Sequence, residues 1–139
     1  MTITKGGCLC GQVRYEIAAE PGPSRLCWCR DCQRIAANGT ANVVFPTASI
    51  AVTGVVNRFV RQADSGNEVT LGFCGQCGTH LFSDSTGRAG LTVVRMGTLD
   101  NPSAVTPTSN IWVTSAPQWA CLDTSLEMRD FGPAPIVAK

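Results

Sequence analysis

The spacing of the cysteines is the feature that most constrains this chain. Seven of its eight cysteines fall into three short clusters, namely Cys8 with Cys10, Cys27 with Cys29 and Cys32, and Cys74 with Cys77. Thiols this close in sequence are typical of zinc ligands. Four thiolates close a tetrahedral zinc site, whereas three leave one coordination position open. The count therefore predicts a structural metal site beside a reactive one.

Disulfide bonds are the alternative use of an even number of cysteines. Disulfide scaffolds, however, are usually shorter and secreted. Residues 1–7 have no apolar run and no cleavage site typical of a signal peptide. No later segment approaches the ~18 continuous apolar residues of a membrane span. We therefore expect a cytoplasmic protein whose thiols stay reduced and hold metal.

Length and composition indicate one folded domain. The chain has 139 residues, of which 44% are hydrophobic and 15% are charged, so a core can form. We predict a single domain over residues 1–139, with its core at about 5–131 and a proline- and alanine-rich tail at 132–139. The formal net charge is +1 without a basic run, so we expect neither nucleic acid nor a membrane as partner. Exposed strand edges are compatible with a homodimer.

Alternation of apolar and polar residues predicts a mainly β fold. The predicted strands cover residues 12–17, 42–45, 50–53, 57–62, 68–73, 80–83, 91–96, 111–114 and 126–131. Glycine, proline, asparagine and serine separate them. One short helix is predicted at residues 31–37, directly after the middle cysteine cluster, and it ends near Asn38 and Gly39.

The clusters differ in their predicted surroundings. Cys74 and Cys77 form a Cys-x-x-Cys turn with Gly75 and Gly78, which is typical of a zinc knuckle with backbone N–H groups pointing at the sulfurs. Two such pairs brought together would close a four-cysteine site. The middle cluster lies instead at the start of the predicted helix. A helix N-terminus lowers the pKa of a thiol, so these sulfurs suit either metal binding or nucleophilic attack.

Several ordered segments carry a family resemblance. They are GCLCGQVRY at 7–15, CWCRDCQR at 27–34 and FCGQCGT at 73–79, followed by IWV at 111–113 and PQW at 117–119. Over about residues 5–119 the chain resembles the glutathione-dependent formaldehyde-activating enzyme family, which also includes the centromere protein V domain. The resemblance implies a β-tent fold of packed antiparallel sheets.

The resemblance also implies two zinc ions and a reaction. It implies a structural zinc on Cys8, Cys10, Cys74 and Cys77, and a second, catalytic zinc on Cys27, Cys29 and Cys32. Two zinc ions per chain are expected, with partial occupancy of the second site left open. In this family the chemistry joins the thiol of glutathione, the co-substrate, to formaldehyde. The product is S-hydroxymethylglutathione, and the enzymes are classed with the carbon–sulfur lyases.

Two arginines beside the middle cluster are candidate glutathione contacts. Arg30 and Arg34 follow the cysteines closely and would clamp a carboxylate if they faced the site. The alternative is that they form a solvated face of the helix, where most arginines lie.

Four further residues need an interpretation. Many family members carry histidine where this chain has Trp28 and Asn110. Trp28 either walls an apolar pocket, which would suit a different substrate, or packs beside the metal. His80, the only histidine, is expected to support the neighbouring site or lie on a strand surface rather than bind metal. Cys121 stands alone and is expected to be a buried, inert thiol.

Two functions remain open at this point. The first is a zinc-dependent carbon–sulfur lyase-type enzyme acting on thiol–aldehyde adducts. The second is a non-catalytic, zinc-bearing module that binds a protein partner or carries a thiol. An open second zinc that binds thiols would favour the enzyme, and a closed or vacant second site would favour the module.

Overall fold

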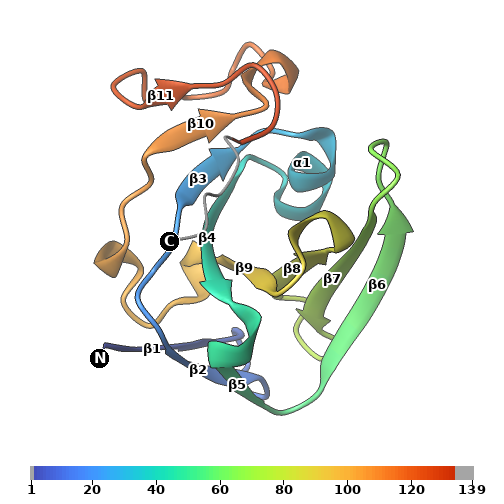
Figure 1. Ribbon diagram of the computed structural model, residues 1–139, viewed down its shortest axis with the longest axis vertical. Coiled ribbons are helices and arrows are strands. Elements are labelled where there is room, and N and C mark those ends of the chain that lie inside the picture. The colour runs from blue at the N-terminus through green and yellow to red at the C-terminus, as the bar shows by residue number, and fades with distance from the viewer. Residues whose placement is uncertain (1, 134–139) are drawn as a thin grey trace.

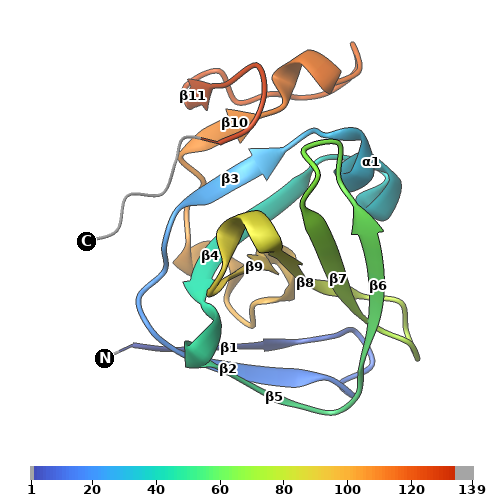
Figure 2. The same ribbon diagram turned by 45° about the vertical axis from the view of Figure 1, so that its right-hand side comes forward.

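Two β-sheets make up the architecture of the computed structural model, which describes residues 2–133. The smaller sheet is antiparallel and has the order β1-β2-β5. Its strands are β1 (Ile3–Gly7), β2 (Arg14–Ala18) and β5 (Ile50–Thr53). This sheet lies at the base of the molecule in Figures 1 and 2.

The larger sheet has eight strands in the order β11-β10-β3-β4-β9-β8-β7-β6. All its pairings are antiparallel except those of β10 with β3 and with β11, which are parallel. Its strands are β3 (Ser24–Cys27), β4 (Thr40–Pro46), β6 (Val56–Gln62), β7 (Glu68–Cys74), β8 (His80–Ser85), β9 (Leu91–Arg95), β10 (Ser109–Ile111) and β11 (Glu127–Met128).

Helix α1 (Arg30–Ala36) is the one α-helix within residues 2–133. It is short because Ala37 takes the left-handed conformation, with φ of 57°. Five 3-10 turns complete the described chain, at η1 (Thr47–Ser49), η2 (Thr86–Arg88), η3 (Met96–Thr98), η4 (Pro102–Ala104) and η5 (Val113–Ser115). In this part of the chain no helix has both the length and the apolar character needed to cross a membrane.

The main core lies between the two sheets. Tyr15 and Ile17 of β2 are buried there against Val43 and Phe45 of β4. The Tyr15 ring meets the ring of Phe82 edge-on, with centroids 5.4 Å apart, and its hydroxyl lies 2.7 Å from the Thr98 hydroxyl. Apolar burial of this kind is the main favourable term in folding, so this core holds the smaller sheet against the larger one.

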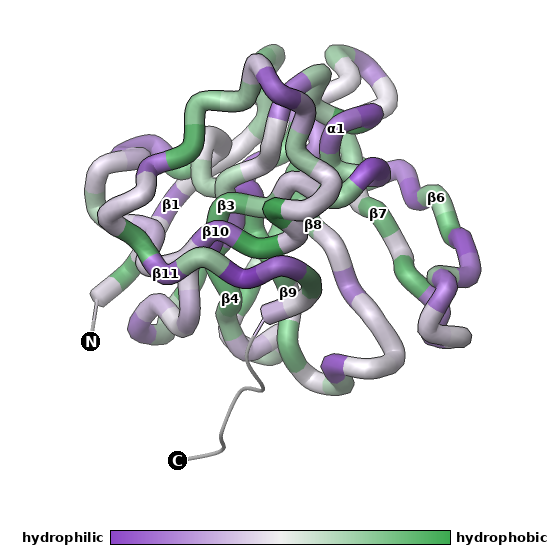
Figure 3. Tube along the Cα trace, turned by 90° about the horizontal axis from the view of Figure 1, so that it is seen from above, coloured by the Kyte–Doolittle hydropathy of each residue, from purple (hydrophilic) through white to green (hydrophobic). Residues whose placement is uncertain are grey.

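The opposite face of the larger sheet is more polar. Because side chains alternate along a strand, Arg25 and Cys27 share this face of β3. The register of the sheet places Asn42 opposite Arg25, and Arg95 opposite Asn42. The larger sheet begins with β11 at one edge and ends with β6 at the other. Hydrophobic and hydrophilic residues are mixed along β6 (Figure 3). The polar face becomes one wall of the candidate site.

The mainly β prediction and the single short helix are confirmed. Strands β1 and β3 were not predicted, because Ile3–Gly7 is mostly polar or glycine and Ser24–Cys27 is too short to alternate clearly. The predicted strand at 111–114 is wrong beyond Ile111. Trp112 takes a left-handed φ of 57°, and Val113–Ser115 continues as η5. The predicted tail at 132–139 lies outside the described residues from position 134 onward.

Candidate metal centres and cavity

Four cysteines from two segments that are 64 residues apart in the sequence meet where the two sheets join. Cys8 and Cys10 lie in the β1–β2 connection, Cys74 ends β7, and Cys77 lies in the β7–β8 turn. Their sulfurs all lie within 4.8 Å of one another. The Cys8–Cys10 and Cys10–Cys74 sulfur separations are 3.6 and 3.8 Å. Zinc–sulfur bonds of ~2.3 Å in a tetrahedron require about 3.8 Å between sulfurs, so the cluster fits a zinc ion.

Polar groups contact three of these four sulfurs. The Val13 N–H points at Cys8 Sγ at 3.2 Å, and Gln12 Nε2 donates to Cys74 Sγ at 3.4 Å. The Thr79 hydroxyl lies 3.2 Å from Cys77 Sγ, and this contact is the main reason that the pKa of Cys77 falls to about 5. A metal requires deprotonated thiols, so these contacts favour metal binding.

One glycine allows Gln12 to support the cluster. Gly54 has φ of +89°, and a Cβ there would overlap the Gln12 carbonyl oxygen. We expect Gly54→Ala to lower the free energy of unfolding by about 3 kcal/mol or more, from left-handed strain and displacement of Gln12. The matched control is Gly66→Ala, which has the same φ but nothing within 4 Å of the added Cβ. Denaturant unfolding of both variants measures the difference, and equal losses would contradict the role given to Gly54.

The second cluster is local to the β3–α1 connection. The sulfurs of Cys27, Cys29 and Cys32 lie within 4.8 Å of one another, and within residues 2–133 no further cysteine, histidine or carboxylate joins them. Cys29 is the N-cap of α1, and its sulfur accepts a hydrogen bond from the Cys32 N–H at 3.4 Å. Three thiols with a free side fit a zinc ion whose fourth position is left for a ligand.

The three neighbouring thiols of this second cluster shift one another's pKa in opposite directions. The thiols of Cys27 and Cys29, in that order, are the largest causes that lower the pKa of Cys32, to about 2, and Arg95 contributes further. The same hydrogen bonding, together with burial, raises the pKa of Cys27. Of these two thiols, Cys32 therefore loses its proton more readily than Cys27.

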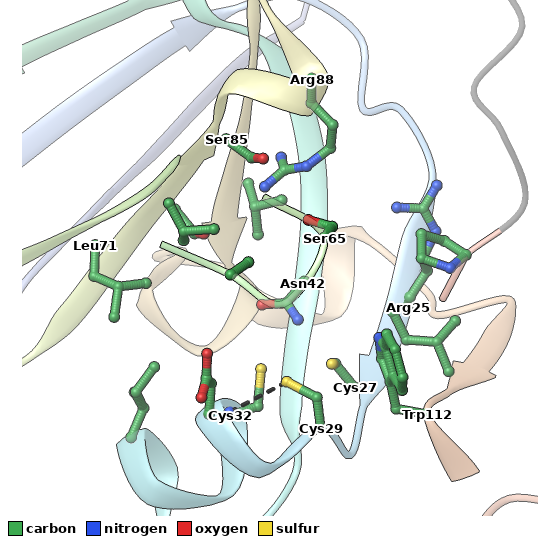
Figure 4. A pocket seen from close by; sticks show the side chains of 18 of the residues that line it. Arg25, Cys27, Cys29, Cys32, Asn42, Ser65, Leu71, Ser85, Arg88 and Trp112 are labelled. Atoms are coloured by element: carbon green, nitrogen blue, oxygen red, sulfur yellow. Dashed lines mark hydrogen bonds between the residues drawn. The ribbon is translucent and has the colours of Figure 1, made fainter. Parts of the chain in front are cut away.

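A cavity of about 410 Å³ opens over the three sulfurs. Its size is in the range of small-molecule sites. Figure 4 shows the sulfurs at one end, beside α1. The tip of the β6–β7 hairpin also lines the cavity, and this hairpin is tied to α1 by the Arg61–Asp31 ion pair at 2.6 Å. Leu71 and Trp112 contribute apolar surface.

The helix arginines lie away from this cavity. Arg30 donates to Gln33 Oε1, and Arg34 is exposed on the outer face of α1. Neither lines the cavity. Trp28 does not line it either. Its ring is buried against Gly39 and meets the ring of Trp119 edge-on, with centroids 6.3 Å apart.

The other singled-out residues also lie outside both clusters. Asn110 is fully buried in β10, and its side chain donates to the Asp123 carbonyl at 2.9 Å. His80 lies in β8 and stacks on Phe73, with centroids 5.4 Å apart. The prediction that Cys121 is buried is wrong. It lies in the loop between η5 and β11, where no strand covers it, and is exposed.

The arginines that do line the cavity were not predicted from the sequence. They are Arg25, Arg61, Arg88 and Arg95. The sequence contains only a weak signal that these arginines lie near the cysteines. Arg25 stands two residues before Cys27, so a strand there would place both side chains on one face. The other three come from strands or turns far away in sequence, and no local pattern connects them to the cysteines.

The fold and these clusters define a mainly β protein with two metal-type cysteine centres, one of four cysteines and one of three that faces a cavity. A sequence-family model described as glutathione-dependent formaldehyde-activating enzyme matches residues 3–115. The chain therefore belongs to this family. A crystal structure of a Rhodobacter sphaeroides protein is similar in fold, with a TM-score of 0.57 and 23% identity over 74% of this chain and 91% of that chain. No protein with a curated description matches the chain.

Proposed function

We propose that this protein is a zinc-dependent enzyme that joins a thiol to a small aldehyde, with glutathione as the thiol and formaldehyde as the aldehyde. Membership of the family supports a role of this type. The observation that carries the proposal is the three-cysteine cluster, which faces a small-molecule cavity on its free side.

The reaction forms one carbon–sulfur bond. The thiol sulfur attacks the aldehyde carbon, the carbonyl π electrons move to oxygen, and the thiol proton ends on that oxygen. A zinc ion bound to Cys27, Cys29 and Cys32 would stabilise the incoming thiol as a thiolate and polarise the aldehyde carbonyl. The protein itself contributes binding and orientation, because the cavity confines both reactants next to the sulfurs.

The two clusters have different roles in this proposal. Cys8, Cys10, Cys74 and Cys77 form a closed set of ligands, so a zinc ion there has no free position and serves the fold. Arg95 and Asn42 form part of one wall of the second site, where Arg95 Nη1 donates a hydrogen bond to Asn42 Oδ1 at 2.6 Å. Arg30 and Arg34 would reach a ligand only beyond the cavity that lies over the sulfurs.

The first test is zinc stoichiometry, measured by elemental analysis on protein purified without chelator and again after titration with glutathione. We expect two zinc ions per chain, of which glutathione perturbs or releases one. Because uncatalysed adduct formation is easy, activity is measured as faster exchange of glutathione between its free and hydroxymethyl forms, followed by NMR at equilibrium. One zinc ion that glutathione does not affect, with unchanged exchange, would overturn the proposal.

The second candidate function is a non-catalytic module that carries a thiol or presents a surface to a protein. Phe59 and Val60, which lie on opposite faces of the outer strand β6, are exposed apolar side chains that favour this candidate, because a partner that pairs with this edge would cover both. Glutathione binding without faster exchange would support the thiol carrier.

A further inference from the structure

The cavity contains more positive charge than its own acidic residues neutralise. Four arginines and two aspartates line it, namely Arg25, Arg61, Arg88, Arg95, Asp31 and Asp64. The only ion pair that any of these six residues makes within residues 2–133 joins Arg61 to Asp31. Three guanidinium groups are therefore left in a cavity that has one further carboxylate.

Two of these guanidinium groups form no hydrogen bond or ion pair with any of residues 2–133. Arg25 is only 9% exposed, yet its guanidinium makes no hydrogen bond or ion pair with any residue that the structure describes. Arg88 Nη1 is fully buried and has no hydrogen-bond acceptor within the same residues. Arg95 differs, because its Nη1 donates to Asn42 and Thr40.

Leaving these groups unpaired is costly. The Arg25 side chain is largely removed from water, and the like charges of Arg88 and Arg129 lie near it. A buried charge is normally paired, and two like charges in one cavity repel each other. Residues held in an unfavourable environment of this kind are typical of binding sites, where the ligand supplies the missing charge.

The arrangement fixes where an anionic group would bind. Arg25 and Cys27 lie on one face of β3, with their Cα atoms two residues, or about 6.6 Å, apart along the strand. Arg88 enters from η2 on another side (Figure 4). The guanidinium ends of Arg25 and Arg88 lie toward the end of the cavity opposite the sulfurs of Cys27, Cys29 and Cys32.

We propose that Arg25 and Arg88 form an anion-binding subsite that selects thiols carrying a carboxylate or phosphate group. This inference rests on the proposed function, because it takes the thiol to lie at the three cysteines. With the sulfur there, the anionic end of the ligand reaches both guanidinium groups and accepts their hydrogen bonds, which are strong because both partners are charged. The subsite thereby determines specificity, while the cysteines bind the reacting sulfur.

The test compares glutathione with its diethyl ester by isothermal titration calorimetry. Arg88→Gln is the main variant, since Arg88 is half-buried on a 3-10 turn and its loss removes like-charge repulsion. We expect it to weaken glutathione binding about tenfold or more, as loss of a charged hydrogen bond does, without lowering the thermal midpoint. The ester should bind wild-type protein more weakly and be insensitive to the substitution. Arg58→Gln on exposed β6 removes the same charge and is the control.

Two outcomes would overturn the subsite. They are equal affinity of wild-type protein for glutathione and its ester, and equal glutathione affinity of Arg88→Gln and Arg58→Gln. S-methylglutathione separates this failure from failure of the proposed function, because it has no free thiol. If it binds in an Arg88-dependent way while wild-type protein does not accelerate exchange, the subsite stands and the proposed reaction fails. If wild-type protein accelerates exchange equally with glutathione and with its ester, the proposed reaction stands and the subsite fails.

Competition experiments distinguish the two kinds of anion. Inorganic phosphate and succinate are each titrated against S-methylglutathione. Stronger competition by phosphate assigns a phosphate-bearing substrate, and stronger competition by succinate assigns a carboxylate-bearing one. In both cases competition should weaken in Arg88→Gln. Competition that is the same in this variant and in wild-type protein would contradict the role of Arg88.

Discussion

Replacing Cys74 with serine should unfold most of the molecule. Cys74 is fully buried in the main core together with Cys8. Its cluster joins the β1–β2 connection of the small sheet to the β7–β8 turn of the large sheet, so a metal there cross-links segments 64 residues apart. Loss of a structural metal ligand is among the few single changes that cost more than about 4 kcal/mol. That is a large part of the ~5–15 kcal/mol that stabilises a domain.

The measurement is thermal unfolding by circular dichroism, combined with zinc content. We expect Cys74→Ser to lose cooperative unfolding at ambient temperature and to retain less than one structural zinc per chain. The matched control is Cys121→Ser, which removes an exposed thiol outside both clusters and should change the free energy of unfolding by less than about 0.5 kcal/mol. A Cys74→Ser protein as stable as this control would show that the four-cysteine cluster does not hold the sheets together.

Replacing Cys29 with serine should have the opposite pattern, with loss of function and little loss of stability. Its cluster belongs to a small separate group with Ile111 and does not connect the two sheets. Cys29 also caps α1 through its sulfur. Serine is one of the preferred N-cap residues, so the cap survives and the thermal midpoint should hold within about 1 kcal/mol of stability.

Function should fall steeply in the same variant. Substitution of residues that only orient metal ligands already costs about 10- to 100-fold in affinity, so loss of a ligand should cost at least about 100-fold. We expect Cys29→Ser to hold one zinc per chain, to lose glutathione binding and to lose accelerated exchange. If Cys29→Ser unfolds as Cys74→Ser does, both clusters are structural and the division between them is wrong.

Local sequence patterns predicted those strands that alternate clearly and the one short helix. Strands such as β2 and β7 alternate apolar and polar residues, and α1 begins within one residue of its predicted start. Strand β3 escaped prediction because four residues, all but one buried, show no alternation. The segment after Ile111 was misjudged because the left-handed backbone of Trp112 has no sequence signal.

The cysteine pairs could also be recognised from the sequence, because ligands two or three residues apart are close in any compact conformation. The family resemblance added which pairs combine. The structure then brought Cys8 and Cys10 to Cys74 and Cys77 and kept Cys27, Cys29 and Cys32 separate. That separation depends on the pairing of β1 with β2 and of β7 with β8, which no spacing rule specifies.

The sequence by itself determined the mainly β class, the short helix and the local sets of thiols, because each depends on residues that are neighbours in the chain. Only the tertiary structure decided that the three-cysteine cluster faces a cavity and that Arg25 and Arg88 point into it while Arg30 and Arg34 do not. The physical reason is that strand order and register bring β3, β4, β9 and η2 around one space. These long-range pairings are set by burial of the whole core, so the environment of each arginine follows from the complete fold.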